Sequence, residues 1–156
     1  MTSTLTAATL TVTLTESISI NGRDQGGTNT LTIASVNEVY KRIVTATTTE
    51  QIILAFGTAV AAGQFIKSEV VYIRITNKDD TNHVAITFRN EDADEFGVKL
   101  DKGQSLIYNG DLSGGVVDTM EAAAVAITPN TFADLVDITA DADTASCDLE
   151  VFVACV

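Results

Sequence analysis

A strict two-residue alternation of apolar and polar side chains constrains this chain more than any other feature. It is clearest in the middle, where residues 71–76 are Val-Tyr-Ile-Arg-Ile-Thr and residues 84–88 are Val-Ala-Ile-Thr-Phe. Successive side chains of a β-strand point to opposite faces, so this period indicates strands with one buried face. We predict that the two segments form a hairpin across the polar link 77–83.

The alternation recurs along the chain, and glycine, asparagine and aspartate mark turns between the segments. Further strands are predicted at residues 10–20, 31–33, 39–44, 50–56, 96–100, 104–108, 116–120, 135–140 and 146–156. Turns are predicted at Asn21-Gly22, Asn90–Asp94 and Asp101–Gly103. The last two strands are expected to pair across Asp141–Asp143, and Glu121–Ile127 is either a helical turn or an alanine-rich strand.

Short strands with turns between them predict an all-β fold. We expect an antiparallel β-sandwich, jelly-roll-like or immunoglobulin-like, of about 8–10 strands with little or no helix. A length of 156 residues predicts one domain, and 46% hydrophobic residues exclude a disordered chain. Residues 1–15 would form an uncharged N-terminal edge strand or an assembly arm of that domain.

The N-terminal segment has an unusual composition for an exposed tail. Residues 1–15 carry no charged side chain, and seven of the fifteen are threonine. Edge strands are normally protected against pairing by lysine or proline, and this segment has neither. It is therefore expected to pair, either within its own sheet or by adding to a sheet of a neighbouring subunit. The candidate interface residues are Leu10, Val12 and Leu14.

The charge balance restricts the partners. Nine basic side chains face 21 acidic ones, a formal charge of −12. Binding to nucleic acid needs clustered cations, and an anionic membrane surface attracts basic segments. Neither a nucleic acid nor a membrane is therefore an expected partner, and no secretory signal is expected at the start of the chain.

The side chains that carry catalysis and metal binding are sparse. His83 is the one histidine and lies in a polar link, where we expect a solvated turn residue. On one extended strand Cys147 and Cys155 would lie about 26 Å apart, too far for a disulfide, so buried free thiols are expected. One histidine and two distant cysteines do not make a zinc site. We predict no catalytic residue, no cofactor and no metal site.

Two acidic turns leave calcium open as an alternative. Asn90–Asp94 and Asp141–Asp143 place oxygen atoms at alternate positions, but neither matches the EF-hand pattern. Solvated turns are the preferred interpretation.

The run from Val71 to Arg89, followed by Phe96 to Leu106, resembles small β-sandwich virion proteins of tailed bacteriophages, especially capsid decoration and tail-associated proteins. The shared features are a strand ending in Ile-Thr-Asn, a polar turn, a second strand, and then Val98-x-Leu100-x-x-Gly103-Gln-Ser. The resemblance covers about 40 residues well.

This resemblance implies a non-enzymatic structural role in the virion, after assembly in the host cytoplasm. It implies a homo-oligomer, often a trimer, in contact with the major capsid protein or other virion proteins, and no catalytic residues. A tail, neck or fibre component is the first alternative. A glycan-binding adhesion module is the second, although the chain has no tryptophan and only 6% aromatic residues.

Overall fold

The computed structural model describes residues 5–121 and 132–156, and these residues contain strands and no helix. The all-β prediction is confirmed. The strands are β1 (Ala8–Glu16), β2 (Ser19–Ile20), β3 (Arg23–Asp24), β4 (Gly27–Val36), β5 (Glu38–Ala46), β6 (Gln51–Gly57), β7 (Phe65–Ile66), β8 (Val70–Asn77), β9 (Val84–Asn90), β10 (Glu95–Leu100), β11 (Ser105–Asn109), β12 (Leu135–Ala142) and β13 (Cys147–Cys155).

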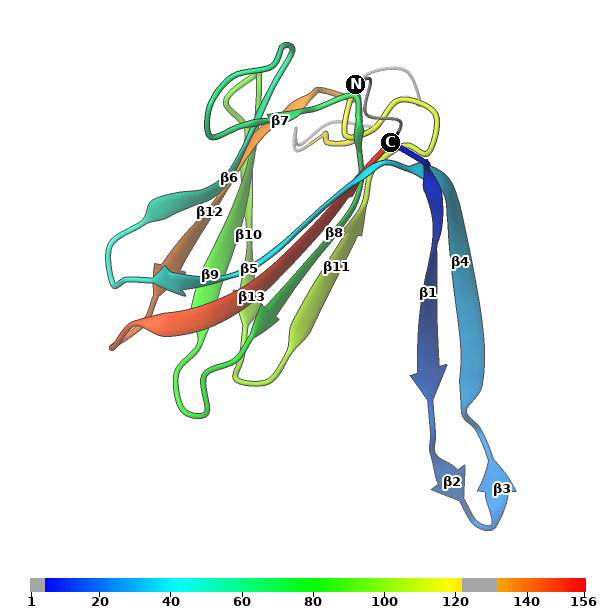
Figure 1. Cartoon of the computed structure of the whole chain (residues 1–156). Helices are drawn as coiled ribbons and strands as arrows, with labels where there is room; N and C mark the ends of the chain where they lie inside the picture. Colours follow the sequence, from blue (N-terminus) through cyan, green and yellow to red (C-terminus); the bar gives the residue numbers. More distant parts are fainter. Residues whose placement is uncertain (1–4, 122–131) are drawn as a thin grey trace.

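In the described part of the chain, nine strands form a two-layered sandwich (Figure 1). One sheet has the order β11-β8-β13-β5, and the other has the order β10-β9-β12-β6-β7. All their pairings are antiparallel except that of the short strand β7 with β6. Without β7, each sheet has four strands, and the chain changes sheet at every connection except β9–β10. This interleaved order is that of a jelly roll, and it differs from the sheet composition of an immunoglobulin domain.

The predicted hairpin of residues 71–88 is wrong. Strand β8 pairs with β11 and β13, whereas β9 pairs with β10 and β12 in the opposite sheet. The predicted pairing of the last two strands is wrong for the same reason, since β12 and β13 lie in different sheets. Alternation reports which side of a strand is buried. It is equally satisfied by two neighbours in one sheet and by two strands that face each other across the core.

Asn77 holds the crossing between β8 and β9 in place. Its side chain is fully buried, and its amide nitrogen donates to the carbonyl oxygens of Asn82 at 3.0 Å and Leu100 at 3.2 Å. Its side-chain oxygen accepts a hydrogen bond from the Asp79 N–H at 2.9 Å. Asn77 therefore ties the β8–β9 link to the end of β10.

Replacing Asn77 by alanine is expected to lower the free energy of unfolding by about 2–3 kcal/mol, because buried backbone groups lose their partners. Urea denaturation of the variant measures this loss. Asn29→Ala, at an exposed position of β4, is the control and should change stability by no more than about 0.5 kcal/mol. Equal losses in the two variants would contradict the role of Asn77.

Side chains from both sheets fill the core, and Val116 of a turn joins them. The largest fully buried ones are Phe88, Ile73, Ile75, Ile86, Leu135, Ile138, Leu149, Val70, Val84, Val116 and Val151. A second, smaller apolar cluster lies on the outer face of the β11-β8-β13-β5 sheet. It contains Val71, Tyr72 and Ala154 of that sheet together with Ile33 and Val36 of β4.

Two further predictions differ from the structure. Residues 31–33 belong to the ten-residue strand β4, which is longer than predicted. Residues 116–120 form turns instead of a strand: the Val116 N–H donates to the Lys67 carbonyl, and Met120 makes an isolated bridge to Ala133. Of the ambiguous segment 121–127, residues 122–127 lie outside the described residues.

Candidate functional site

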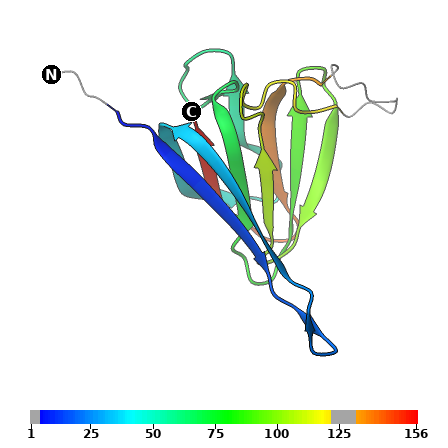
Figure 2. The same ribbon diagram turned by 90° about the vertical axis from the view of Figure 1, so that its right-hand side faces the viewer.

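Strand β1 lies outside both sheets of the sandwich and pairs antiparallel with β4 of its own chain. With the short tip strands β2 and β3, the two form a hairpin of residues 8–36, which we call the arm. Figures 1 and 2 show that the arm runs along the outside of the sandwich and that its tip extends beyond it. The N-terminal segment is thus paired within its chain, but not within a sheet of the core.

The tip turn is the predicted Asn21-Gly22 pair. Asn21 has a φ of 52° and Gly22 a φ of 75°, as the tight turns of hairpins require. Ile18 and Ile20 beside this turn are 52% and 53% exposed. The tip therefore presents apolar side chains to solvent.

The arm has one apolar and one threonine face. The apolar face carries Leu10, Val12 and Leu14 of β1 with Leu31 and Ile33 of β4. On the other face the cross-strand pairs are Thr11 with Thr32, Thr13 with Thr30 and Thr15 with Thr28. Threonine suits the pleated strand surface, which explains the threonine-rich sequence without any further role.

The apolar face is covered at the base of the arm and exposed toward its tip. Ile33 is 3% exposed where it packs with Tyr72 and Ala154 on the sheet. Val12 is half-buried, and Leu14 is 53% exposed. Of the predicted interface residues, Leu10 and Val12 help to fix the arm to its own sandwich, whereas Leu14 is available to a partner.

A groove of about 320 Å³ runs along β1, between the arm and the sheet. Leu10, Thr11, Val12 and Thr13 line one side; Tyr72, Arg74, Ile107 and Phe152 line the other. Tyr72 and Phe152 pack edge to face at 6.0 Å. Because the β1 side consists of consecutive residues, the groove follows the edge of the strand as well as its apolar face. We call this space the edge groove.

Charge is distributed unevenly between the arm and the sandwich. Residues 1–36 contain one basic and two acidic side chains, all between Glu16 and Asp24, a net charge of −1. The remaining residues therefore carry −11 of the total of −12. Arg74 in the edge groove is paired with Glu150 at 2.5 Å. The arm is thus the part of the surface that a second acidic molecule can approach with the least repulsion.

The arm joins the sandwich through a short connection. Asn37 alone separates β4 from β5, and its N–H donates to the Cys155 carbonyl at 3.0 Å. Val36 packs in the outer apolar cluster beside Ala154.

His83 and Cys147 lie closer than the sequence suggests, but not as a catalytic pair. The His83 ring faces Asp143 at 3.6 Å, whereas the Cys147 thiol donates to the His83 backbone carbonyl at 3.7 Å. Burial and the nearby Asp79, Asp148 and Asp143 carboxylates raise the pKa of the Cys147 thiol. A nucleophilic cysteine needs the opposite shift.

The second cysteine is also a buried free thiol, as predicted. Burial, with smaller contributions from Glu38 and Glu69, raises the pKa of Cys155 to about 12.

The acidic turns do not form a metal cluster. The Asn90 side-chain oxygen accepts the N–H groups of Asp92 at 3.1 Å and Asp94 at 2.8 Å, so it stabilises the turn. Asp143 lies beside His83. Within residues 5–121 and 132–156 no group of three histidine, cysteine or acidic side chains is placed to hold a metal ion.

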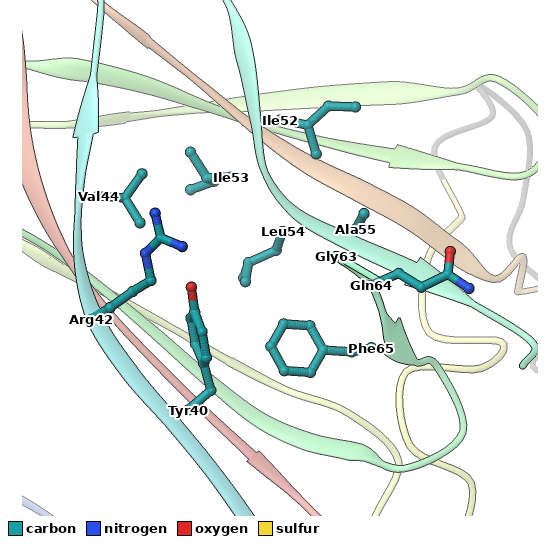
Figure 3. Close-up of a pocket in the computed structure, with 10 residues that line it drawn as sticks. All are labelled: Tyr40, Arg42, Val44, Ile52, Ile53, Leu54, Ala55, Gly63, Gln64 and Phe65. Atoms are coloured by element: carbon teal, nitrogen blue, oxygen red, sulfur yellow. The ribbon is translucent and has the colours of Figure 1, made fainter. Parts of the chain in front are cut away.

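A second hollow lies between β5 and β6, at the open side of the sandwich (Figure 3). It has a volume of about 430 Å³. Tyr40 and Phe65 meet edge to face at 5.4 Å, and the Arg42 guanidinium lies 5.9 Å from the centre of the Tyr40 ring. Figure 3 shows that the Arg42 side chain extends into this space. The hollow combines an aromatic wall with a cation.

The sequence did not identify the edge groove, because its walls come from four strands far apart in the chain. The one signal was the uncharged N-terminal segment, which indicated β1 but not the opposite wall formed by Tyr72, Ile107 and Phe152. No helix long and apolar enough to cross a membrane occurs in the described part of the chain. No protein-family model and no curated protein matches this chain.

Proposed function

We propose that the chain is a non-enzymatic structural protein of a bacteriophage virion, which decorates or cements the capsid as a homo-oligomer. The observation that carries the proposal is the arm, a hairpin with a net charge of only −1 and an apolar face that continues beyond the sandwich. The resemblance of the Val71–Leu106 region to virion accessory proteins supplies the setting. The major capsid protein and further copies of the chain are the proposed partners.

Attachment by the arm would rest on burial of apolar surface. Leu14, Ile18 and Ile20 are each more than half exposed and lie along the distal part of the hairpin. Fully burying a side chain of this size contributes about 1.5–3 kcal/mol. The acidic sandwich would meanwhile face solvent and keep neighbouring particles apart.

Removal of the arm tests the proposal. With residues 11–32 replaced by Asn-Gly, particles should bind the protein at least about tenfold less well, because the exposed apolar anchors are gone. Binding is measured by cosedimentation with undecorated particles, and circular dichroism checks that the sandwich is still folded. Val60→Ser is the control, since Val60 is 87% exposed but lies outside the arm. Full binding by the arm-deleted protein would contradict the proposal.

A component of the tail, neck or fibre remains the alternative within the same class. Labelled protein bound to intact particles distinguishes the two, because decoration of a head involves many more copies than a tail structure.

A glycan-binding module is the second candidate, favoured by the hollow beside Tyr40, Arg42 and Phe65. Aromatic faces and a few polar groups are typical of ligand sites of this size. Binding on a glycan array that is lost in Arg42→Ala would support this candidate against the assembly role.

A further inference from the structure

We propose that the free edge of β1 pairs antiparallel with β1 of a second copy, about a two-fold axis, and that each β1 fills the other copy's edge groove. The product is a dimer with a continuous sheet β4-β1-β1′-β4′, where the prime marks the second copy. This inference rests on the proposed assembly function and names the surface and the partner.

The first observation is the open edge of β1. Among the described residues β1 pairs only with β4, so its other edge has unpaired backbone groups. Its register is regular from Leu10 to Glu16, and Leu10–Thr15 contains no charge and no proline. A two-stranded hairpin has only marginal stability in water, and an unprotected edge of this kind can pair with another strand.

The two edges of the arm are not equivalent. Ala8 pairs with Val36 but Leu10 pairs with Ile33, so β4 has an extra residue here and forms a bulge. Ser35 within this bulge has a φ of 63°. Bulges disrupt and twist an edge and so protect it from pairing. β1 is therefore the preferred edge, which favours a two-fold β1–β1′ pairing over a ring in which β1 pairs with β4 of the next copy.

The edge groove, of about 320 Å³, provides space for side chains of one more strand paired to β1. A neighbouring strand lies about 4.8 Å from β1, and alternate side chains would point the same way as Leu10 and Val12. These side chains would cover Tyr72, Ile107 and Phe152. Ile107 is 39% exposed without such a cover.

A strand that fits the edge groove needs no charge and a sequence in which apolar residues alternate with small ones. It also has to belong to a molecule that can approach this acidic protein. β1 of a second copy meets each condition. With Val12 opposite Val12′, Leu10 lies opposite Leu14′, and threonines lie opposite threonines on the outer face. Leu14 is then covered, and the two-fold axis fills both grooves at once.

Light scattering after size-exclusion chromatography provides the first test. The full chain is expected at twice its mass of 16.4 kDa. Thr13→Lys should weaken the dimer about tenfold or more, because the two lysines would lie only about 8 Å apart across the axis. Thr30→Lys is the matched control on the same face. Thr30 pairs with Thr13 within the arm, but its lysines would be about 16 Å apart, beyond the Debye length.

Cross-linking tests the register. Under mild oxidation Val12→Cys should form a disulfide-linked dimer, because directly opposed strand residues lie within disulfide range. Leu31→Cys, the partner of Val12 on β4, should not. Circular dichroism spectra that match the spectrum of the unmodified chain would show that the variants fold.

A monomer or a trimer of the unmodified chain, equal weakening by both lysine variants, or cross-linking at Leu31→Cys alone would each overturn the inference. Cosedimentation with particles separates it from the proposed function. Thr13→Lys that binds particles without dimerising refutes the dimer's role in attachment and leaves attachment by the arm intact.

Discussion

Replacing Phe88 by alanine is expected to lower the free energy of unfolding by about 3–5 kcal/mol. Phe88 is 1% exposed and lies on β9 at the centre of the core. Its ring stacks on Phe96 at 4.8 Å and meets Tyr108 of the opposite sheet at 5.2 Å. The loss combines the removal of buried apolar area with a cavity between the two layers.

Phe96→Ala is the matched control, because it removes the other half of the same aromatic pair. Phe96 is 40% exposed on the edge strand β10. Its replacement by alanine should lower the free energy of unfolding by only about 1–2 kcal/mol. Chemical denaturation of both variants measures the difference. If Phe96→Ala cost as much as Phe88→Ala, the pair itself rather than the buried core position would determine the stability.

Replacing Lys67 by methionine is expected to lower the free energy of unfolding by about 3 kcal/mol, because it leaves the Asp134 carboxylate without its cation. The Lys67 ammonium bonds to Asp134, and each side chain is 13% exposed. Glu91 lies 3.6 Å from the same ammonium but is 51% exposed, so it contributes less. Asp134 also accepts the Asp118 N–H at 3.0 Å.

A second variant separates an unpaired charge from a loss of packing. Lys67→Met combined with Asp134→Asn removes both charges and keeps an acceptor for the Asp118 N–H. The double variant should therefore be more stable than Lys67→Met alone. A double variant that is less stable would show that packing of the lysine stem dominates.

The same pair predicts how stability depends on pH. Burial opposes ionisation of Asp134, but the hydrogen bonds from Lys67 and the Asp118 N–H, together with the lysine charge, hold its pKa below the ordinary 3.8. The contribution of ionised Asp134 to the stability of the fold is thus fully present above pH 3.8 and is lost as the pH falls through the lowered pKa. Burial also opposes the charge on Lys67, yet Asp134 and Glu91 raise its pKa above 10.5.

The contribution of charged Lys67 to stability is therefore complete below pH 10.5 and is lost as the pH rises through the raised pKa. Denaturation midpoints should show an acid-dependent loss in the unmodified chain that is smaller in Lys67→Met.

The strand pattern predicted the faces of the strands better than their partners. Ile73, Ile75, Ile86 and Phe88 are all buried, as their alternation indicated. Asn77 forms hydrogen bonds within the link that carries the chain from β8 to β9 in the opposite sheet, and alternation contains no signal for this crossing. The turn at Asn21-Gly22 was predictable because both residues tolerate positive φ.

The surface that carries the proposals was only partly predictable. An uncharged N-terminal strand made Leu10, Val12 and Leu14 candidates. The edge groove, however, depends on Phe152 and Ile107, and the ion pair depends on Lys67 and Asp134. Lys67 and Asp134 are 67 positions apart in the chain, and Ile107 and Phe152 are 45 apart, so a local pattern does not report either contact.

The short connection at Asn37 has a mechanical consequence. A pull on the arm tip reaches the sandwich through one covalent tether and through the apolar contacts of Ile33 and Val36 with the sheet. The noncovalent contacts yield first, whereas the tether leads into β5, which is fastened to β13 by nine residue pairs. The arm would then detach from the sheet and rotate about Asn37 while the jelly roll stays folded. A displaced copy would remain able to bind its partner again through the same arm.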